Sequence, residues 1–470
     1  MTERARARRQ LPLRSLRNVL AVGCLLVCAD AKAGVREQRL WQAVRDDNHA
    51  AVRMLLAQHA DPNATLADKS AVLAWAVNRQ DEQSVRLLLK AGAKPNVLDV
   101  DGASPLLLAC ELGDPAIVAN LLKAGANAKA TRPDGISALA LCAGISTPET
   151  LESLIARGAD VNRADPTGQT PLMWAAAKGR TDNMATLIKL GANVNAATRK
   201  GFTPLLFALK SQVSAAPNML ADAGADTKVL LPDGTSLIQA AITEHDVPFA
   251  MRLVAALPDV NVRDQHGRQM IHIAAASGSA ELVKLVLSKG GDPNAMTPEV
   301  KAVTRSVAKI DVPTESLVPF PRIVVHAIAP SPESATSPLH FAARAGSVVA
   351  MKALIEAGAK TDTRAQDGAT LSMAAAAGGN LDALKYALEL DPELDARTLD
   401  GRSIIHMVIG NPYGPDDQDI IRFLVERGAQ LELKDNTGHT PGLMVNRTGP
   451  PTLRVMYVQM LKDHGIVSQF

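Results

Sequence analysis

At 470 residues the chain is too long for one ordinary hydrophobic core, which predicts either several domains or an elongated array. Apolar residues make up 47% of it and aromatic residues only 3%, so burial must come from Ala, Leu and Val packed in thin layers, as in helix-on-helix folds. The net charge of +2 argues against a nucleic-acid binder held by counterion release.

Residues 1–33 have the features of a secretory signal peptide. An apolar run from Val19 to Ala29 follows a basic segment and precedes small residues that suit a cleavage site. The run is shorter than the roughly 20 residues that span a bilayer, so we expect removal and export to the periplasm or the medium. The alternatives are a lipoprotein cysteine at Cys24, a twin-arginine route at Arg8 and Arg9, an organelle transit peptide, and a cytoplasmic chain with a basic tail. The basic segment contains Arg4, Arg6, Arg8, Arg9, Arg14 and Arg17.

A glycine recurs at a constant step of 33 residues through the middle of the chain, at Gly102, Gly135, Gly168, Gly201, Gly234 and Gly267. The register then jumps by one repeat plus 35 residues to Ala335, and resumes at Gly368, Gly401 and, after a short insertion, Gly438. Self-similarity at such a period is the signature of a repeat architecture.

One unit of the repeat predicts two short helices and a turn. Pro171 suits the first position of a helix, where a missing N–H costs nothing, and this helix should end before Gly179. A second helix from about Thr181 presents apolar residues on one face and stops at Gly191, a position suited to a left-handed cap. The turn-rich segment that follows should project as a finger. Helices this short cannot bury their apolar faces alone, so the units must stack.

Two columns of the repeat describe the packing. The residue six positions after each glycine is apolar throughout, from Trp75 and Trp174 to Met444, and is predicted to be core. The next residue is small in almost every unit, as in Ala109, Cys142 and Ala175, which should let neighbouring helices approach closely.

Two segments break the pattern. Residues 300–334 contain five prolines and lose the repeat, so a helical pair is improbable there and an extended loop is expected. We predict either a tolerated surface insertion or a segment that reaches across the concave face or pairs with a partner. A smaller insertion at 411–415 should lengthen one turn between helices. The predicted organisation is therefore a signal peptide (1–33), a repeat block (34–299), the insertion (300–334) and a second repeat block with a C-terminal cap (335–470).

Catalytic and metal-binding motifs are absent from the sequence: it has no phosphate loop, dinucleotide fingerprint, nucleophile elbow or Cys-x-x-Cys pair. His272, His340 and His406 share one column, where a structural hydrogen-bonding role is favoured over metal binding. Beyond the signal peptide only Cys110 and Cys142 remain. Helix packing at about 8–10 Å would hold them too far apart for a disulfide, so they are interpreted as small core residues.

The repeated residues resemble ankyrin repeats. The T-P-L-H-x-A-A signature of that family is readable at 170–176, 203–205 and 337–343, and its V-x-x-L-L-x-x-G-A ending at 85–93, followed by Asn96. The resemblance implies an all-α solenoid of about twelve stacked helix-turn-helix units with atypical end units. It also implies a non-catalytic, monomeric scaffold that binds a protein partner, without a cofactor, nucleic acid or, after signal removal, a membrane. The alternative is an enzyme or enzyme subunit whose site combines the 300–334 insertion with the groove.

In the ankyrin family, partners bind the concave side formed by the finger tips and the exposed edge of the first helix. Phe202 is interpreted either as an exposed anchor or as a side chain folded against its own turn, and His266 as a binding residue or a solvated turn residue. The clustered cations form either a solvated face or a site for an acidic partner. Carried over by position, the expected partner-binding residues are Arg199, Lys200, Phe202, Lys178, Lys210, Gln265, His266 and Arg268.

Overall fold

The computed structural model describes residues 34–65, 70–231, 233–299, 335–410, 414 and 416–466. These residues form 24 helices, α2 to α25, and no strand, with isolated β-bridges such as Thr65 to Ala71. The all-α expectation is therefore confirmed. No helix within these ranges has the length and apolarity needed to cross a membrane. Contacts divide the described chain into two compact units, residues 34–237 (unit 1) and 238–466 (unit 2).

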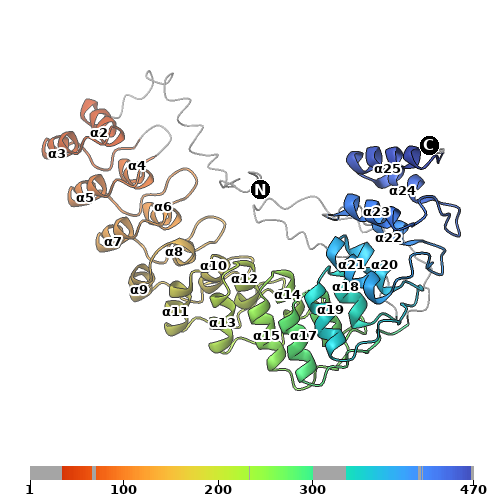
Figure 1. Ribbon diagram of the computed structural model, residues 1–470. Coiled ribbons are helices and arrows are strands. Elements are labelled where there is room, and N and C mark those ends of the chain that lie inside the picture. Colours follow the sequence, from red (N-terminus) through yellow and green to blue (C-terminus); the bar gives the residue numbers. More distant parts are fainter. Residues whose placement is uncertain are drawn as a thin grey trace. The chain divides into compact units, whose positions relative to one another are not determined.

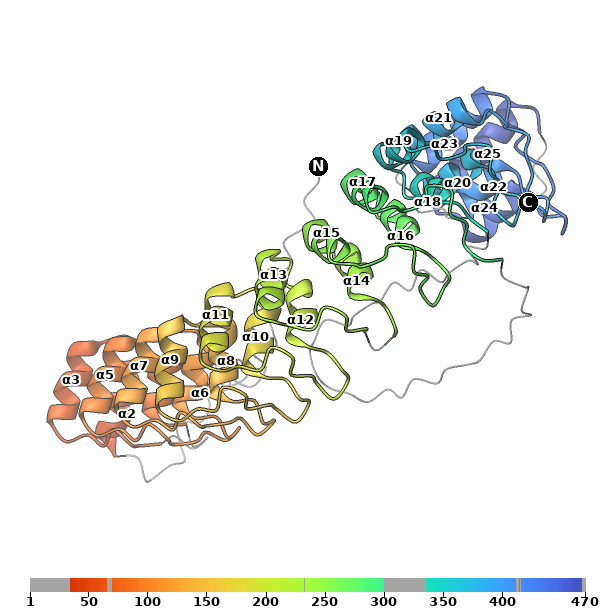
Figure 2. The ribbon, with the colours of Figure 1, turned by 90° about the horizontal axis from the view of Figure 1, so that it is seen from below.

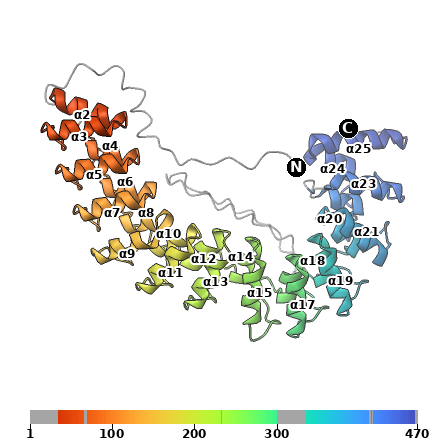
Figure 3. The same ribbon diagram turned by 60° about the vertical axis from the view of Figure 1, so that its left-hand side comes forward.

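Unit 1 consists of helix pairs stacked in two layers. The first helices α4, α6, α8, α10 and α12 pack on one another in order, and the second helices α3 to α13 form the other layer (Figures 1 and 3). The bounds are α2 (Val35–Arg45), α3 (His49–Ala57), α4 (Val72–Asn78), α5 (Glu82–Lys90), α6 (Pro105–Leu112), α7 (Pro115–Lys123), α8 (Ala138–Ile145), α9 (Pro148–Ala156), α10 (Pro171–Ala177), α11 (Thr181–Lys189), α12 (Pro204–Lys210) and α13 (Ala215–Asp222).

Unit 2 repeats the same two-layer stacking. Its first helices α16 to α24 pack successively, and so do the second helices α15 to α23. The last helix, α25, has 13 residues and is longer than the others, as expected for an atypical end unit. The bounds are α14 (Leu237–Thr243), α15 (Val247–Ala255), α16 (Met270–Ala276), α17 (Ala280–Ser288), α18 (Pro338–Arg344), α19 (Val348–Glu356), α20 (Leu371–Gly378), α21 (Leu381–Leu390), α22 (Ile404–Ile409), α23 (Asp417–Glu426), α24 (Pro441–Thr448) and α25 (Pro451–Asp463).

The two columns of the repeat have different environments. The small-residue column is fully buried wherever the sequence predicted it, including Ala109, Ala175 and Ala342, which confirms the closely packed seam. The column one residue earlier is only partly core: Leu141, Ala240, Ile273, Phe341 and Ala374 are buried, whereas the other six members are half-buried. At least one half-buried member lies beside a finger, since the Phe207 ring is 6.4 Å from that of Phe202, measured between centroids. The half-buried members are Trp75, Leu108, Trp174, Phe207, Met407 and Met444.

An asparagine near the base of the finger joins successive repeats of unit 1. Its Nδ2 donates to the carbonyl of the glycine that ends the next second helix, at 3.0 Å from Asn162 to Gly191. Its Oδ1 accepts the backbone N–H of the residue two positions after that glycine, at 2.8 Å between Asn193 and Asn162. We call this pair of bonds the amide clamp. It is made by Asn63, Asn96, Asn162 and Asn195.

Asn162→Ala is expected to lower the stability of the joint between the repeats α8/α9 and α10/α11. The loss of both bonds should cost about 1–3 kcal/mol, because each net hydrogen bond contributes about 0.5–1.5 kcal/mol. Urea denaturation and amide hydrogen exchange along α8 to α11 measure this loss of stability. Arg163→Ala is the matched control, since the Arg163 side chain makes neither bond. An equal loss in the control would contradict a specific role for the clamp.

The repeat stack of unit 2 continues across the segment 300–334. Asn294 donates to the carbonyl of Gly358 at 2.9 Å and accepts from the Lys360 N–H at 2.8 Å, so the clamp joins residues 64 and 66 positions apart. Helix α16 packs on α18 and α17 on α19. The predicted division into blocks before 300 and after 334 stays a prediction. The expected loop at 300–334 lies outside the described residues.

The prediction that Cys110 and Cys142 stand too far apart for a disulfide is wrong. Their Cα atoms are 4.5 Å apart and their sulfur atoms are bonded, joining α6 to α8. The spacing of 8–10 Å applies to helix axes, whereas residues that face each other across a seam of small side chains come much closer. Both cysteines are fully buried.

Candidate partner-binding surface

The fingers are tight turns held by their own backbone and by an acidic or hydroxyl side chain. In the finger before α10, the Gly168 N–H donates to the Asp165 carbonyl, and the Asp165 carboxylate accepts the N–H groups of Thr167 and Gln169 at 2.8 and 2.9 Å. Gly168 has a φ of +92°, a conformation that suits glycine. The turns of unit 1 project on the side of the first helices (Figure 2).

The finger at 198–202 carries three of the predicted binding residues. Thr198 takes the place of the aspartate, and its Oγ1 accepts the Phe202 N–H at 3.0 Å. The Arg199 N–H donates to the Thr167 carbonyl of the preceding finger at 3.0 Å, so the two tips are linked through their backbones. The side chains of Arg199 and Lys200 are exposed on this supported tip.

Phe202 is half-buried, and its ring lies 6.4 Å from that of Phe207, measured between centroids. It therefore contacts the first helix of its own repeat and keeps part of its surface accessible. Lys178 follows the last residue of α10, Lys210 ends α12, and both are exposed. Half-buried Trp174 lies in α10, four residues before Lys178. Trp174 and Phe207 were predicted to be core, and their half-burial corrects that prediction. The column is apolar throughout, so nothing in the sequence separates its half-buried members from its buried ones.

The remaining predicted residues lie in unit 2, on the finger at 264–268. Gln265 and His266 are exposed, and their Nε2 atoms are 3.3 Å apart. The Arg268 guanidinium instead bonds the Asp264 carboxylate of its own turn at 3.0 Å, so it is held within the finger. The predicted set is thus divided between two units, and only the five residues of unit 1 are brought together by one stack.

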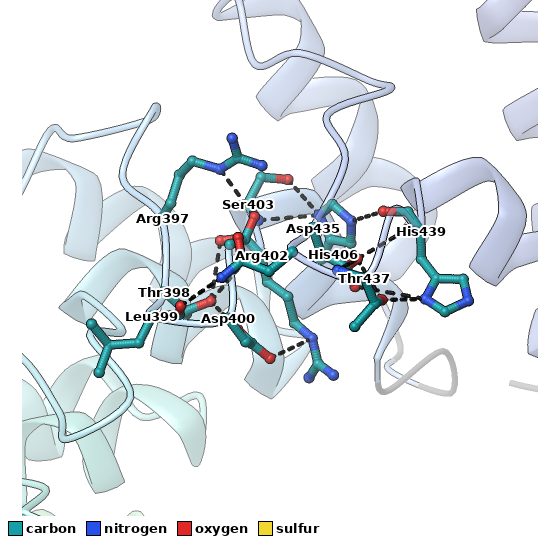
Figure 4. A network of polar contacts seen from close by, with 12 residues as sticks. Arg397, Thr398, Leu399, Asp400, Arg402, Ser403, His406, Asp435, Thr437 and His439 are labelled. Carbon is teal, nitrogen blue, oxygen red and sulfur yellow. Dashed lines mark hydrogen bonds and ion pairs between the residues drawn. The ribbon is translucent and has the colours of Figure 1, made fainter.

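Two fingers of unit 2 form a polar network that the sequence analysis missed (Figure 4). Arg397 donates through Nε to the Gly401 carbonyl at 3.0 Å and through Nη2 to the Lys434 carbonyl of the next finger. The Asn436 N–H reaches the Asp400 carbonyl at 2.9 Å. Arg263 and Arg364 occupy the same repeat position and also donate to the carbonyl of their finger glycine. An arginine four residues before the finger glycine was the sequence signal.

The network supports a finger tip whose apolar side chain is exposed to solvent. Leu399 lies at the tip between Thr398 and Asp400, is 75% exposed, and has its N–H bonded to the Asp367 carbonyl at 2.7 Å. Backbone bonds on both sides of this tip therefore present Leu399 on a supported turn.

The three column histidines make hydrogen bonds at the starts of their helices through Nδ1. His272 accepts the Gln269 N–H on Nδ1 at 3.1 Å, and its Nε2 lies 2.9 Å from the Ala295 carbonyl, as a donor. Ser403 and His406 make the equivalent cap on α22. Burial lowers the pKa of His272 and of His340 to about 4, and also lowers the pKa of His406. Neutral rings of this kind fit the predicted hydrogen-bonding role.

The described part of the chain has cavities but no clustered metal ligands. It contains no group of three or more His, Cys, Asp or Glu side chains placed to hold a metal ion. A cavity of about 300 Å³ lies between the starts of α23 and α25, lined by residues that include Asp416, Asp417 and Thr452. Burial raises the pKa of Asp417 to about 6, and Asp416 adds to the shift. A second space, beside Trp75 and Leu108, holds only about 20 Å³, well below an ordinary ligand site.

Comparison with known proteins gives the same class of protein as the geometry. A family model for ankyrin repeats (3 copies) matches residues 40–132, 136–230, 212–297 and 339–435. The chain belongs to the ankyrin repeat family, whose repeats are generally protein–protein interaction modules. Among solved structures, it is similar to the ankyrin repeat domain of Bcl-3, a member of the IkappaB protein family, with 28% identity and a TM-score of 0.37 over 43% of this chain and 93% of that one. No curated protein matches the chain.

Proposed function

We propose that the chain is a non-catalytic scaffold that binds an acidic protein segment along the fingers and first-helix edges of unit 1. The observation that carries the proposal is the group at 199–202: two exposed cations on a backbone-linked tip, beside a half-buried aromatic pair, Phe202 and Phe207. Lys178 and Lys210 extend the positive charge along the helix edge. An aromatic anchor with cations at its rim is the composition typical of a binding hot spot.

The proposal is tested by isolating the partner and then weakening the site. Crosslinking mass spectrometry in the native compartment identifies the partner, and the affinity is measured for two variants. Phe202→Ala should weaken binding by roughly 10- to 100-fold, as loss of a hot-spot aromatic does. Arg199→Ala with Lys200→Ala should mainly slow association and flatten its dependence on salt, because rim charges steer encounter.

Lys189→Ala is the matched control, since Lys189 is an exposed cation that ends α11, a second helix of the same stack. It should leave both affinity and association rate unchanged. Wild-type affinity in the Phe202 and the Arg199/Lys200 variants would exclude this surface as the binding site, and a neutral or basic partner would exclude the acidic assignment.

We also propose that the protein is exported and acts as a monomer. Residues 1–33, which carry the expected signal peptide, lie outside the described residues, and the support is their basic, apolar and small-residue pattern. N-terminal sequencing of the mature protein is the test: a start near residue 34 supports export, and an intact Met1 or Thr2 start contradicts it. Light scattering on the same sample measures the oligomeric state.

A further inference from the structure

Five joints connect the six helix pairs of unit 1, and four of them carry the amide clamp. At the remaining joint, between α6/α7 and α8/α9, Lys129 occupies the asparagine position. A lysine has no carbonyl oxygen to accept the Asp160 N–H, so one half of the clamp cannot form. The rest of the local geometry is retained: the Asn127 side chain accepts the Lys129 N–H at 3.0 Å, as Asn193 does for Asn195 at 2.9 Å.

The disulfide lies at this same joint. Cys110 is on α6 and Cys142 is on α8, the first helices of the two repeats that Lys129 leaves without a clamp. No other described joint has a covalent link, since the only cysteines outside residues 1–33 are this pair. The neighbours Ala109 and Ala143 are fully buried, so the bond lies inside the buried seam.

We propose that the Cys110–Cys142 disulfide replaces the missing amide clamp, and that the stiffness of unit 1 at this joint depends on the redox state of its surroundings. Under oxidising conditions all five joints are held, four by hydrogen bonds and one by the covalent bond. Under reducing conditions the joint between α6/α7 and α8/α9 retains its helix packing and the Lys129 side chain beside Gly158, but neither the covalent bond nor the clamp, and the stack opens there first. The finger-tip surface that spans the joint is then no longer held as one platform.

The bond forms by thiol–disulfide exchange. One cysteine thiolate attacks the disulfide of a protein or small-molecule oxidant and releases one of its sulfurs as a thiol. The second cysteine, as its thiolate, then displaces the oxidant's other sulfur, so two protons and two electrons leave the pair and the oxidant is reduced to a dithiol. Because both sulfurs are buried in the finished seam, exchange takes place before α6 and α8 dock or during their transient separation.

Hydrogen exchange on the full mature chain tests the proposal. The amides of α6 to α9 are compared in oxidised protein, in protein treated with a phosphine reductant under mildly denaturing conditions and returned to buffer, and in Cys110→Ala/Cys142→Ala, alanine being the small residue usual at these positions. We expect exchange in this segment to be about tenfold faster or more without the bond, and that of α10 to α13 to change much less.

Lys129→Asn in the double-alanine background is the rescue. The Gly158 carbonyl and the Asp160 N–H stand where the other clamps find their partners, so the new asparagine should restore slow exchange whatever the redox state. Lys228→Asn in the same background is the matched control. It makes the same substitution after α13, where Leu257 stands in place of the clamp's glycine, so it should restore nothing at the α6–α9 joint.

Three results would overturn the proposal. The first is a pair of free thiols at Cys110 and Cys142 in protein folded with a disulfide oxidant, measured by alkylation and peptide mass mapping. The second is exchange along α6 to α9 that is equal with and without the bond. The third is failure of Lys129→Asn to rescue, which would show that the disulfide does not stand in for the clamp.

Discussion

Gly168→Ala is expected to destabilise unit 1 by about 2–5 kcal/mol and to displace the finger that follows. Residue 168 has a φ of +92°, which costs an L side chain about 1–2 kcal/mol. An added Cβ would also lie 2.8 Å from the Thr198 Cα and 3.0 Å from the Arg199 nitrogen, both backbone atoms that cannot rotate away. Overpacking of this kind adds about 1–3 kcal/mol.

The matched control is Gly201→Ala, one repeat further along. Gly201 has a similar φ of +81°, but an added Cβ would meet nothing within 4 Å. It should therefore show the backbone cost alone, about 1–2 kcal/mol. Urea denaturation gives the two losses, and exchange of the Arg199 amide reports its bond to the Thr167 carbonyl. If both substitutions cost the same, the fingers do not support one another through close backbone contact.

Gly168→Ala should also weaken binding of the partner. Arg199 and Lys200 are presented by the finger that Gly168→Ala would push away, and neither side chain is itself altered. Partner affinity should therefore fall in Gly168→Ala and be nearly retained in Gly201→Ala at a temperature where both remain folded. Such a result would tie the proposed site to the finger stack as well as to the charges.

Acidification from pH 7 to pH 5 is expected to destabilise unit 2 selectively. Burial lowers the pKa of His272 and His340 from 6.5 to about 4, while Arg263 near the first and Arg344 near the second add to the shift. Between pH 6.5 and 4 the unfolded state binds protons that the folded state excludes, so the free energy of unfolding falls as the pH falls. From pH 7 to pH 5 each histidine should lower the free energy of unfolding by about 2 kcal/mol, because about 1.5 pH units of this interval lie below 6.5 and each is worth about 1.4 kcal/mol.

Two other groups modify the effect. The pKa of His406 is also lowered by burial and acts in the same direction. The pKa of Asp417 is raised to about 6, so the folded state binds its proton more tightly below pH 6 and partly offsets the loss. Asp417→Asn should therefore steepen the decline of stability with acidification.

Hydrogen exchange at pH 7 and pH 5, corrected for intrinsic rates, measures the change in each unit separately. Unit 1 is the internal control, because the three column histidines all lie in unit 2. His272→Gln should be less stable than the wild type at pH 7 but should show a smaller decline toward pH 5, whereas His266→Gln, at an exposed finger tip, should keep the wild-type decline. A decline of equal size in both units would rule out the buried histidines as its cause.

The boundary between unit 1 and unit 2 coincides with a change of residue type at the clamp positions. The last repeat of unit 1 ends with Lys228 at the asparagine position, and the residue 29 positions later is Leu257 instead of glycine. The asparagine and the glycine of the clamp are thus both replaced at the repeat where the contacts place the boundary between the units, near residue 237. The insertion at 300–334 is the more conspicuous break in the sequence, yet the clamp from Asn294 joins the repeats on either side of it.

The sequence by itself determined the repeat, its helices and its buried seam. The 33-residue glycine step, the prolines at helix starts and the small-residue column are local requirements of backbone conformation and close helix approach, so each can be read from residue type and spacing. Pro171 and the helix from Thr181 stand where those rules placed them. The charged finger at 199–200 was likewise readable, because exposure at a turn follows from the same pattern.

Only the tertiary structure decided how the columns face one another. Cys110 and Cys142 meet because their separation depends on the docking of α6 against α8, which no property of either residue encodes. Trp174 and Phe207 are half-buried while Leu141, in the same column, is buried, because the neighbouring elements cover each side chain to a different extent. Arg268 is bound within its own turn and Arg397 spans two fingers, although both are arginines at finger positions. Contacts between repeats depend on the joint positions of two surfaces, and a sequence pattern describes only one surface at a time.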